Sequence, residues 1–173
     1  MTSNLAAPAA DDQIPPSLLE RLERLETAEA ARETAYRYAQ AIDAPDFELL
    51  AGVFALDATL TTRRGSRTSR EAIVDYYREA LAAPLARRHF IVNEQVTWLA
   101  PGEVRMHSSF IYTFAGDDTS ILGWGRYVDH IRIDNGVGVI VEKTISIDTH
   151  ADSREGWAAV PPAATAAPVS TDR

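Results

Sequence analysis

The sequence predicts a single α+β domain in which a curved antiparallel sheet wraps around one long helix and two shorter helices. Two observations predict this class. The first half of the chain carries helix-capping residues and apolar residues at helical spacing. The second half predicts four long strands separated by turn sequences. Helices followed by an antiparallel meander are typical of α+β domains, and such a sheet closed on one side by a long helix forms a cone with an internal pocket.

The first predicted helix is long. Ser17 and Glu20 have the spacing of a capping box, and an apolar stripe begins at Leu18 and continues to Ile42. Pro45 is expected to end the helix, because the residue before a proline disfavours helical geometry.

Two shorter helices and a short strand follow. Asp46 is expected to cap a helix over "FELLAGVFA", and "ATLTT" predicts a strand. Thr68 and Glu71 form a second capping box, which predicts a helix that runs through Ala83 and stops at Pro84. The basic residues of the intervening turn are interpreted as solvated and not as an anion site; they are Arg63, Arg64, Arg67 and Arg70.

Four segments after the third helix predict the long strands: "HFIVNEQVTWL", "VRMHSSFIYTF", "SILGWGRYVDHIRI" and "VGVIVEKTISID". On the second of them, strand alternation gives Ser108, Phe110 and Tyr112 one face, which is the better pocket lining, and places His107 on the opposite face. Three charged residues of the third strand are expected to be cross-strand partners on the surface; they are Asp129, His130 and Arg132.

Composition excludes several classes of function. The formal net charge is −8, which argues against a nucleic-acid partner. There is no cysteine, so disulfides and thiolate chemistry are excluded. No apolar run approaches the roughly 18–20 residues of a membrane span, and the first residues show no secretory signal. We therefore expect a cytoplasmic protein without a membrane partner.

The domain is expected to span residues 14–150. Residues 1–13 and 151–173 are rich in alanine and proline and lack apolar periodicity, so both are predicted to be disordered tails. At 173 residues the chain suits one domain with a sizeable core.

Three stretches resemble one family: "AARETAYRYAQAIDAPDFELLAGVFALDATL", "RRHFIVNEQV" and "GWGRYVDHIRIDNGVGVIVEKTISID". Together with the element order, they are similar to the SnoaL-like branch of the nuclear-transport-factor-2-like superfamily over about residues 18–150. This resemblance implies the cone-shaped fold. It leaves the reaction open, because the family includes dehydratases, dehydrohalogenases, isomerases, polyketide cyclases and non-enzymatic pocket domains.

Asp43 and His89 are the candidate catalytic pair. Asp43 ends the first helix, where the helix dipole disfavours a carboxylate, so a histidine or a cation nearby is expected. The resemblance implies that partner to be His89, since dehydratases of the family pair an Asp and a His at these positions. A neutral imidazole can take a proton from carbon, and a carboxylate on its other nitrogen fixes the tautomer. Without the resemblance, a core histidine is the more common interpretation. Arg87 and Arg88 are interpreted as rim charges.

Tyr38 is the third catalytic candidate, because the resemblance implies a tyrosine that polarises a substrate carbonyl. An equally consistent interpretation is a core tyrosine with its hydroxyl at the rim. The expected substrate-binding residues are mainly aromatic and lie on the strands and the second helix; they are Phe54, Trp98, Ser108, Phe110, Tyr112 and Trp124. The spacing of Asp148 and His150 does not predict a metal site, and no cofactor is expected.

These observations predict a cofactor-independent lyase that acts by dehydratase-type elimination on a hydrophobic cyclic or polyketide-like small molecule. An isomerase or cyclase with the same pair is the alternative among enzymes, and a non-catalytic ligand-binding or assembly subunit is the alternative from another class. The sheet face that the helices leave uncovered predicts a homodimer or higher homo-oligomer.

Overall fold

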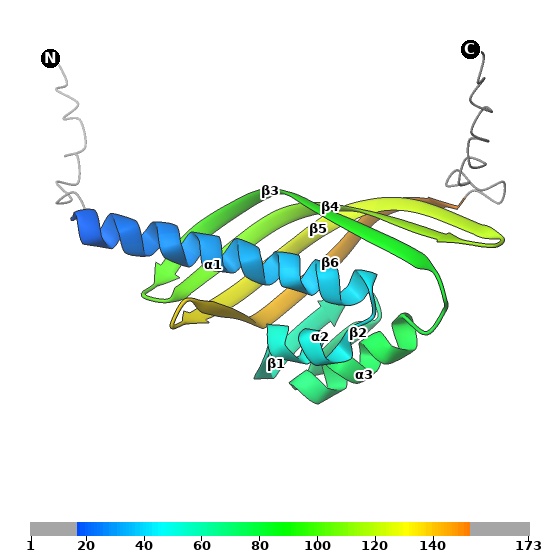
Figure 1. Cartoon of the computed structure of the whole chain (residues 1–173), viewed down its shortest axis with the longest axis horizontal. Coiled ribbons are helices and arrows are strands. Elements are labelled where there is room, and N and C mark those ends of the chain that lie inside the picture. Colours follow the sequence, from blue (N-terminus) through cyan, green and yellow to red (C-terminus); the bar gives the residue numbers. More distant parts are fainter. Residues whose placement is uncertain (1–16, 153–173) are drawn as a thin grey trace, which may run out of the picture.

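The computed structural model describes residues 17–152 and contains three helices and one curved sheet of six strands (Figure 1). In chain order the elements are α1 (Leu18–Asp43), α2 (Phe47–Val53), β1 (Phe54–Thr62), β2 (Gly65–Thr68), α3 (Arg70–Ala80), β3 (Ala86–Ala100), β4 (Glu103–Gly116), β5 (Thr119–Asp134) and β6 (Val137–Asp152). The predicted α+β class is confirmed. The predicted tails lie outside the described residues, except that β6 continues two residues past the expected domain end at 150.

The sheet has the strand order β2-β1-β6-β5-β4-β3. The four long strands form the predicted antiparallel meander, with 14 to 16 residues each. The expectation of a wholly antiparallel sheet is wrong, because β1 pairs with β6 in parallel. The last strand of the meander offers a free edge beside the helices, and β1 occupies it while β2 folds back as a short hairpin partner.

Several element boundaries differ from the prediction. The second helix stops at Val53, because Phe54 already pairs with Ile140 of β6. Thr68 belongs to β2, so the cap of α3 is Ser69, whose hydroxyl accepts a hydrogen bond from the amide of Ala72 at 3.3 Å. The helix ends at Ala80, three residues before the predicted end.

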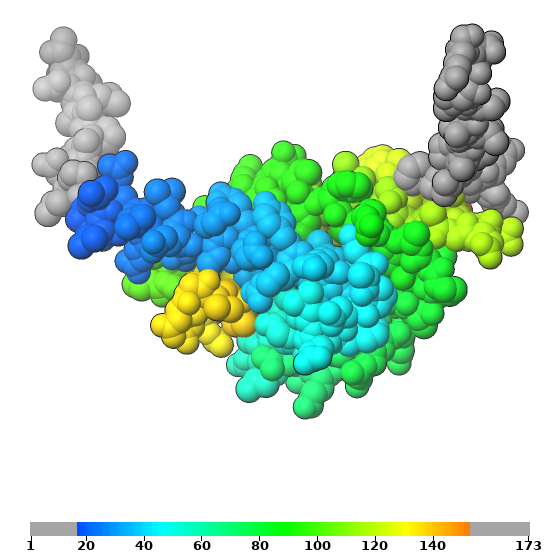
Figure 2. Space-filling model, viewed as in Figure 1, coloured from blue at the N-terminus to red at the C-terminus, as the bar shows by residue number. Residues whose placement is uncertain are grey.

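The capping box of α1 is present as predicted, with Ser17 and Glu20 bonded to each other's backbone amides. The apolar stripe is buried only from Thr27 onward. Leu18, Leu22 and Leu25 are exposed, because the first turns of α1 extend beyond the body of the molecule (Figures 1 and 2). The predicted apolar stripe therefore contributes to the core only after the first two turns.

The second half of α1 packs closely on the sheet. A Cβ at Gly138 of β6 would clash with the hydroxyl of Thr34, so only glycine allows this approach. The guanidinium of Arg37 donates to the Gly138 carbonyl at 2.7 Å and fixes the contact. These contacts carry the C-terminal end of α1 across the concave side of the sheet toward β3, as Figure 1 shows.

The sheet bends where β3 contains a bulge. The pairing of β3 with β4 shifts between Val92 and Gln95, and Asn93 adopts a left-handed backbone conformation with φ 56°. Asparagine tolerates this conformation better than most residues, and bulges of this kind increase strand curvature. The bend lets His89 approach the end of α1 while the rest of β3 lies along its side. Within residues 17–152, no helix combines the length and apolar character that crossing a bilayer requires.

Candidate active site

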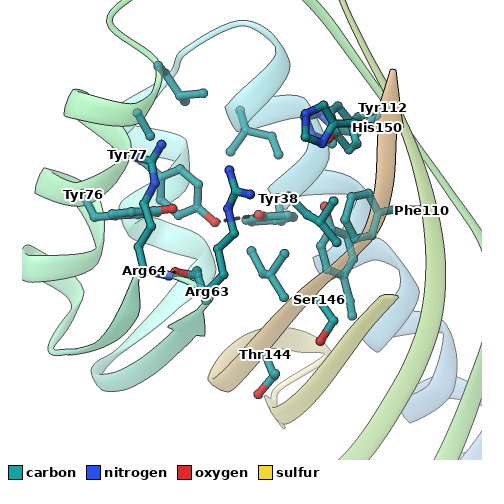
Figure 3. Close-up of a pocket in the computed structure, with 18 of the residues that line it drawn as sticks. Tyr38, Arg63, Arg64, Tyr76, Tyr77, Phe110, Tyr112, Thr144, Ser146 and His150 are labelled. Carbon is teal, nitrogen blue, oxygen red and sulfur yellow. Dashed lines mark hydrogen bonds between the residues drawn. The ribbon is translucent and has the colours of Figure 1, made fainter. Parts of the chain in front are cut away.

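The concave side of the sheet, the end of α1 and the helix α3 enclose a pocket of about 720 Å³ (Figure 3). Its walls are mainly aromatic and aliphatic side chains. The polar and aromatic residues of the lining include Tyr38, Arg63, Arg64, Tyr77, His89, Phe110, Tyr112, Phe114 and Tyr127. A pocket of this size accommodates a small organic molecule.

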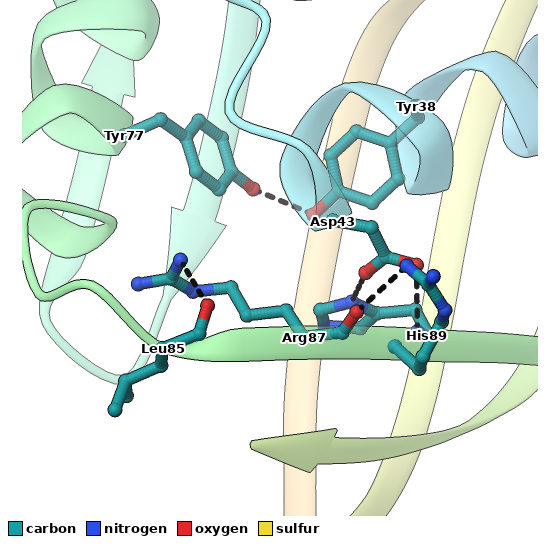
Figure 4. A network of polar contacts seen from close by, with 7 residues as sticks. Tyr38, Asp43, Tyr77, Leu85, Arg87 and His89 are labelled. Atoms are coloured by element: carbon teal, nitrogen blue, oxygen red, sulfur yellow. Dashed lines mark hydrogen bonds and ion pairs between the residues drawn. The ribbon is translucent and has the colours of Figure 1, made fainter. Parts of the chain in front are cut away.

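Asp43 and His89 are in direct contact at the wall of this pocket (Figure 4). Asp43 Oδ1 lies 2.6 Å from His89 Nδ1, and Asp43 Oδ2 accepts a hydrogen bond from the His89 backbone amide at 3.1 Å. The side chains are only 9% exposed for His89 and 12% exposed for Asp43. Both carboxylate oxygens are therefore held by the same residue, which fixes the orientation of the pair.

The contacts of Asp43 assign the proton on the His89 ring. An ionised carboxylate only accepts hydrogen bonds, so Nδ1 is the protonated nitrogen that donates to Asp43. Nε2 then carries a lone pair, and among the described residues no side chain hydrogen-bonds to it. The ring lines the pocket, so this lone pair is the group with which His89 can take a proton.

Local structure explains why the two residues meet. Asp43 is the last residue of α1, where free backbone carbonyls disfavour a negative charge. His89 lies on β3, the edge strand, so its outward amide has no strand partner and is available to Asp43. The amide and the imidazole together offset the unfavourable position of the carboxylate at the helix end.

Arg87 secures the segment that leads to His89. Its side chain is buried, and the guanidinium donates to the carbonyls of Leu81, Ala83 and Leu85 at 3.1, 2.5 and 3.0 Å. These carbonyls follow the C-terminal end of α3, where carbonyls no longer have partners within the helix, and that of Ala83 also accepts from the amide of Leu85 at 2.9 Å. The interpretation of Arg87 as a rim charge is wrong, because these three carbonyls draw the side chain inward.

Aromatic rings of β4 surround His89. Phe110, Tyr112 and Phe114 have ring centroids 6.4, 6.0 and 5.8 Å from that of His89. Phe110 and Tyr112 were expected in the pocket, whereas Phe114 was missed although it continues the same alternation. Gly125 and Gly123 of β5 lie directly opposite Phe110 and Tyr112, and a Cβ at either glycine would collide with the facing ring. The glycines of "GWG" therefore let these rings lie against the sheet.

Tyr38 and Tyr77 bring two phenol groups to the pocket. Their hydroxyl oxygens lie 2.7 Å apart, and both side chains are buried (Figure 4). Burial raises the pKa of Tyr38 and of Tyr77 well above the ordinary value, so both phenols stay protonated at neutral pH. One hydroxyl donates to the other, which leaves one O–H for a substrate oxygen. Tyr77 was not anticipated, since its only sequence signal is a position on the apolar face of α3.

Beneath these tyrosines lies a buried ion pair between Lys143 and Asp129. Lys143 Nζ is 3.0 and 3.1 Å from the two Asp129 oxygens, and it lies 4.1 and 3.7 Å from the ring centroids of Tyr38 and Tyr127. Burial raises the pKa of Asp129 and lowers that of Lys143, while each charge opposes the shift of the other. The prediction that Asp129 lies on the surface is wrong, because β5 alternation places it between Tyr127 and Ile131 on the buried face.

Four of the expected substrate-binding residues do not line the pocket. Phe54 is buried in the core against Tyr38, and the buried Ser108 hydroxyl has no hydrogen-bond partner among the described residues. Trp98 lies below Arg24 of α1, and Trp124 is exposed on the outer face of the sheet. Aromatic character alone could not distinguish the pocket from these positions.

Of the other three histidines, two lie outside the pocket, as strand alternation predicted, and the third lines it. His107 is exposed on the outer face of β4. His130 Nε2 is 3.2 Å from Glu103, as expected for a cross-strand surface pair. His150 of β6 lines the pocket. Residues 17–152 contain no cluster of three or more His, Cys, Asp or Glu side chains placed to hold a metal ion.

The basic turn divides into two pairs. Arg67 lies over the Tyr76 ring at 4.7 Å, and Arg70 donates to the Phe54 carbonyl at 2.8 Å. Arg63 and Arg64 instead line the pocket, and Figure 3 shows their side chains extending into it from the turn between β1 and β2. Arg63 and Arg64 are exposed, as the interpretation of a solvated turn expects, but their place in the lining of the pocket was not anticipated.

A cone-shaped sheet, three helices and an internal pocket define a domain of the nuclear-transport-factor-2-like class. The model of the SnoaL-like domain matches residues 23–143, so the chain belongs to the SnoaL-like family. No curated protein matches the chain significantly in sequence.

Solved structures support the fold. A hexachlorocyclohexane dehydrochlorinase, LinA-type3 from Novosphingobium barchaimii LL02, matches with a TM-score of 0.72 and 18% identity over 82% of this chain and 99% of that chain. A protein proposed to be a scytalone dehydratase, from Novosphingobium aromaticivorans, matches with a TM-score of 0.70 and 16% identity over 77% and 91% of the two chains. A protein proposed to be the β subunit of an aromatic-ring-hydroxylating dioxygenase, from the same species, matches with a TM-score of 0.62 and 17% identity over 73% and 92%.

Proposed function

We propose that this protein is a cofactor-independent lyase that removes water from a hydrophobic cyclic or polyketide-like small molecule, with Asp43 and His89 as its catalytic pair. The 2.6 Å contact between Asp43 Oδ1 and His89 Nδ1, at the wall of an apolar pocket, is the observation that carries the proposal. The dehydrochlorinase and dehydratase names among the structural neighbours agree with an elimination.

In the proposed reaction His89 Nε2 takes a proton from the carbon next to a substrate carbonyl. The C–H electron pair moves into an enolate, and Asp43 stabilises the imidazolium that forms. The free O–H of the Tyr38–Tyr77 pair donates to the enolate oxygen. The enolate electrons then form the new carbon–carbon double bond and expel the β-hydroxyl, which takes the proton from His89 and leaves as water.

An isomerase or cyclase is the second candidate within enzymes, because it begins with the same proton abstraction. It differs in that His89 returns the proton to another carbon, or a new carbon–carbon bond forms, without loss of water. A non-catalytic assembly subunit is the candidate from another class. The pocket of about 720 Å³ favours an enzyme over a purely structural role, because an apolar pocket of this size with a few polar groups is typical of small-molecule sites.

A panel of cyclic β-hydroxy-ketones in deuterated water tests the proposal. We expect mass spectrometry to show loss of one water from at least one member in the presence of the protein. Deuterium uptake without water loss would support the isomerase instead. Binding of panel members without either change would favour the ligand-binding subunit.

We also propose that a second copy of the chain covers the outer face of the sheet. Phe90, Ile111 and Trp124 are directly aligned across β3, β4 and β5, and they are 53%, 41% and 49% exposed. A row of exposed apolar side chains on a sheet is typical of an interface. Light scattering should give the mass of a dimer or higher oligomer for the wild type and a lower mass for Ile111→Lys. A monomeric wild type would contradict the proposal.

A further inference from the structure

Arg63 and Arg64 give the pocket a positive rim. Both are exposed residues of the turn between β1 and β2, and both line the pocket, whereas His89 lies deeper. No aspartate or glutamate belongs to the lining, although the chain carries a net charge of −8. The charged side chains of the lining are therefore cationic in an acidic protein.

The protein itself leaves these two charges available. Within residues 17–152, neither guanidinium makes a hydrogen bond or an ion pair with another side chain. Their neighbours Arg67 and Arg70 are engaged with Tyr76 and with the Phe54 carbonyl. Two adjacent guanidinium groups at the opening of an apolar pocket are suited to bind a carboxylate, because their planar donors match its two oxygens.

The charge of Arg63 acts within the pocket. Burial raises the pKa of Tyr112, and the positive charge of Arg63 opposes that shift. Tyr112 is also one of the three aromatic residues whose rings lie beside His89, with centroids 6.0 Å apart. Arg63 at the rim and His89 at the wall therefore face the same pocket.

We propose that the substrate carries a carboxylate, which Arg63 and Arg64 bind at the rim while the apolar body of the molecule lies against the aromatic wall near His89. This inference rests on the proposed function, since it names the class of substrate for that site. It makes the substrate an apolar cyclic acid that also carries the ketone of the proposed reaction, rather than a ketone without charge. Binding at the rim would also fix which end of the molecule reaches His89.

Two probes of equal shape and different charge test this proposal: 2-naphthoate and 2-naphthamide, titrated by calorimetry. We expect the wild type to bind 2-naphthoate at least about tenfold more tightly than 2-naphthamide, as charge-assisted hydrogen bonds predict. The preference should decrease at high salt, because the rim is exposed. Arg63→Gln/Arg64→Gln should lose the preference and keep its affinity for 2-naphthamide.

Three controls separate the alternatives. Arg63→Lys/Arg64→Lys keeps the charge and should retain most of the preference, even if the glutamine variant folds poorly. Arg21→Gln/Arg78→Gln removes the same charge at exposed sites on α1 and α3, and should behave like the wild type. His89→Gln should keep the preference although it loses the proposed activity, so failure of the reaction and failure of carboxylate binding are separate results.

The proposal is overturned if the wild type binds both probes equally or binds neither. It is also overturned if Arg63→Gln/Arg64→Gln keeps the preference for 2-naphthoate. An equal loss in Arg21→Gln/Arg78→Gln would show that the general field of the protein, and not the rim, attracts the anion.

Discussion

Replacing His89 by glutamine is expected to lower kcat/KM of the proposed elimination by at least about a hundredfold, the usual contribution of a general base. Glutamine keeps the backbone amide that donates to Asp43 Oδ2 at 3.1 Å, and it has a similar length. It lacks a nitrogen lone pair that can take a proton at neutral pH. The loss should therefore appear in kcat, while thermal unfolding shows a stable fold.

Asp43→Asn provides the matched comparison. The asparagine amide can present its N–H group to Nδ1, which would move the ring proton to Nε2 and remove the free lone pair. We expect a loss similar in size to that of His89→Gln. The double variant should be no worse than His89→Gln alone, because the two residues act as a unit. Full activity in His89→Gln, or additive losses in the double variant, would contradict the catalytic pair.

Replacing Lys143 by methionine is expected to lower the free energy of unfolding by about 3–5 kcal/mol, because it leaves the Asp129 carboxylate buried without its partner. Both side chains of the pair are fully buried. Methionine fills most of the space of the lysine stem, so the cost comes mainly from the unpaired charge and from the lost contacts of Nζ with the rings of Tyr38 and Tyr127. Urea unfolding measures this loss.

The effect of Lys143→Met should depend on pH. Burial raises the folded-state pKa of Asp129, and without Lys143 only the weaker influence of His107 opposes that shift. A group whose folded-state pKa lies above its unfolded value contributes stability at low pH and loses it as pH rises through the folded-state pKa. The variant should therefore be closest to the wild type in acid and furthest from it at neutral pH.

Two further variants complete the test of the buried pair. Asp129→Asn/Lys143→Met should recover much of the lost stability, because no charge remains buried. Arg126→Met breaks the exposed pair with Asp148 and should cost at most about 1 kcal/mol. A loss for Lys143→Met no larger than that of Arg126→Met would show that the buried pair does not stabilise the fold.

Local signals in the sequence predicted most of the fold. Capping residues located the start of α1 and the cap of α2, and turn sequences separated the four long strands. The place of β1 could not be predicted in this way, because its partner is β6, about 80 residues further along the chain. Only the assembly of the whole sheet decides which strand occupies that free edge.

The candidate site was predictable where a local conflict marked it. Asp43 stands at the end of a helix that disfavours its charge, and this conflict pointed to a partner. The family resemblance implied that this partner is His89, and the two side chains lie in contact in the structure. No local conflict in the sequence indicated that Lys143 and Asp129 are buried, because charged residues on strands usually face solvent. Arg63 and Arg64 looked like an ordinary basic turn, and only the curvature of the sheet brings them over the pocket.

The central claim is that the Asp43–His89 pair removes a proton from carbon, and solvent-deuterium exchange measures that step most directly. The wild type, His89→Gln and Asp43→Asn would each be incubated in deuterated water with the member of the ketone panel that binds best. We expect deuterium uptake at the carbon next to the carbonyl, or loss of its proton together with the β-hydroxyl as water, in the wild type, and both processes should be slowed at least about a hundredfold in the two variants. Equal rates of exchange in the wild type and in His89→Gln would contradict it.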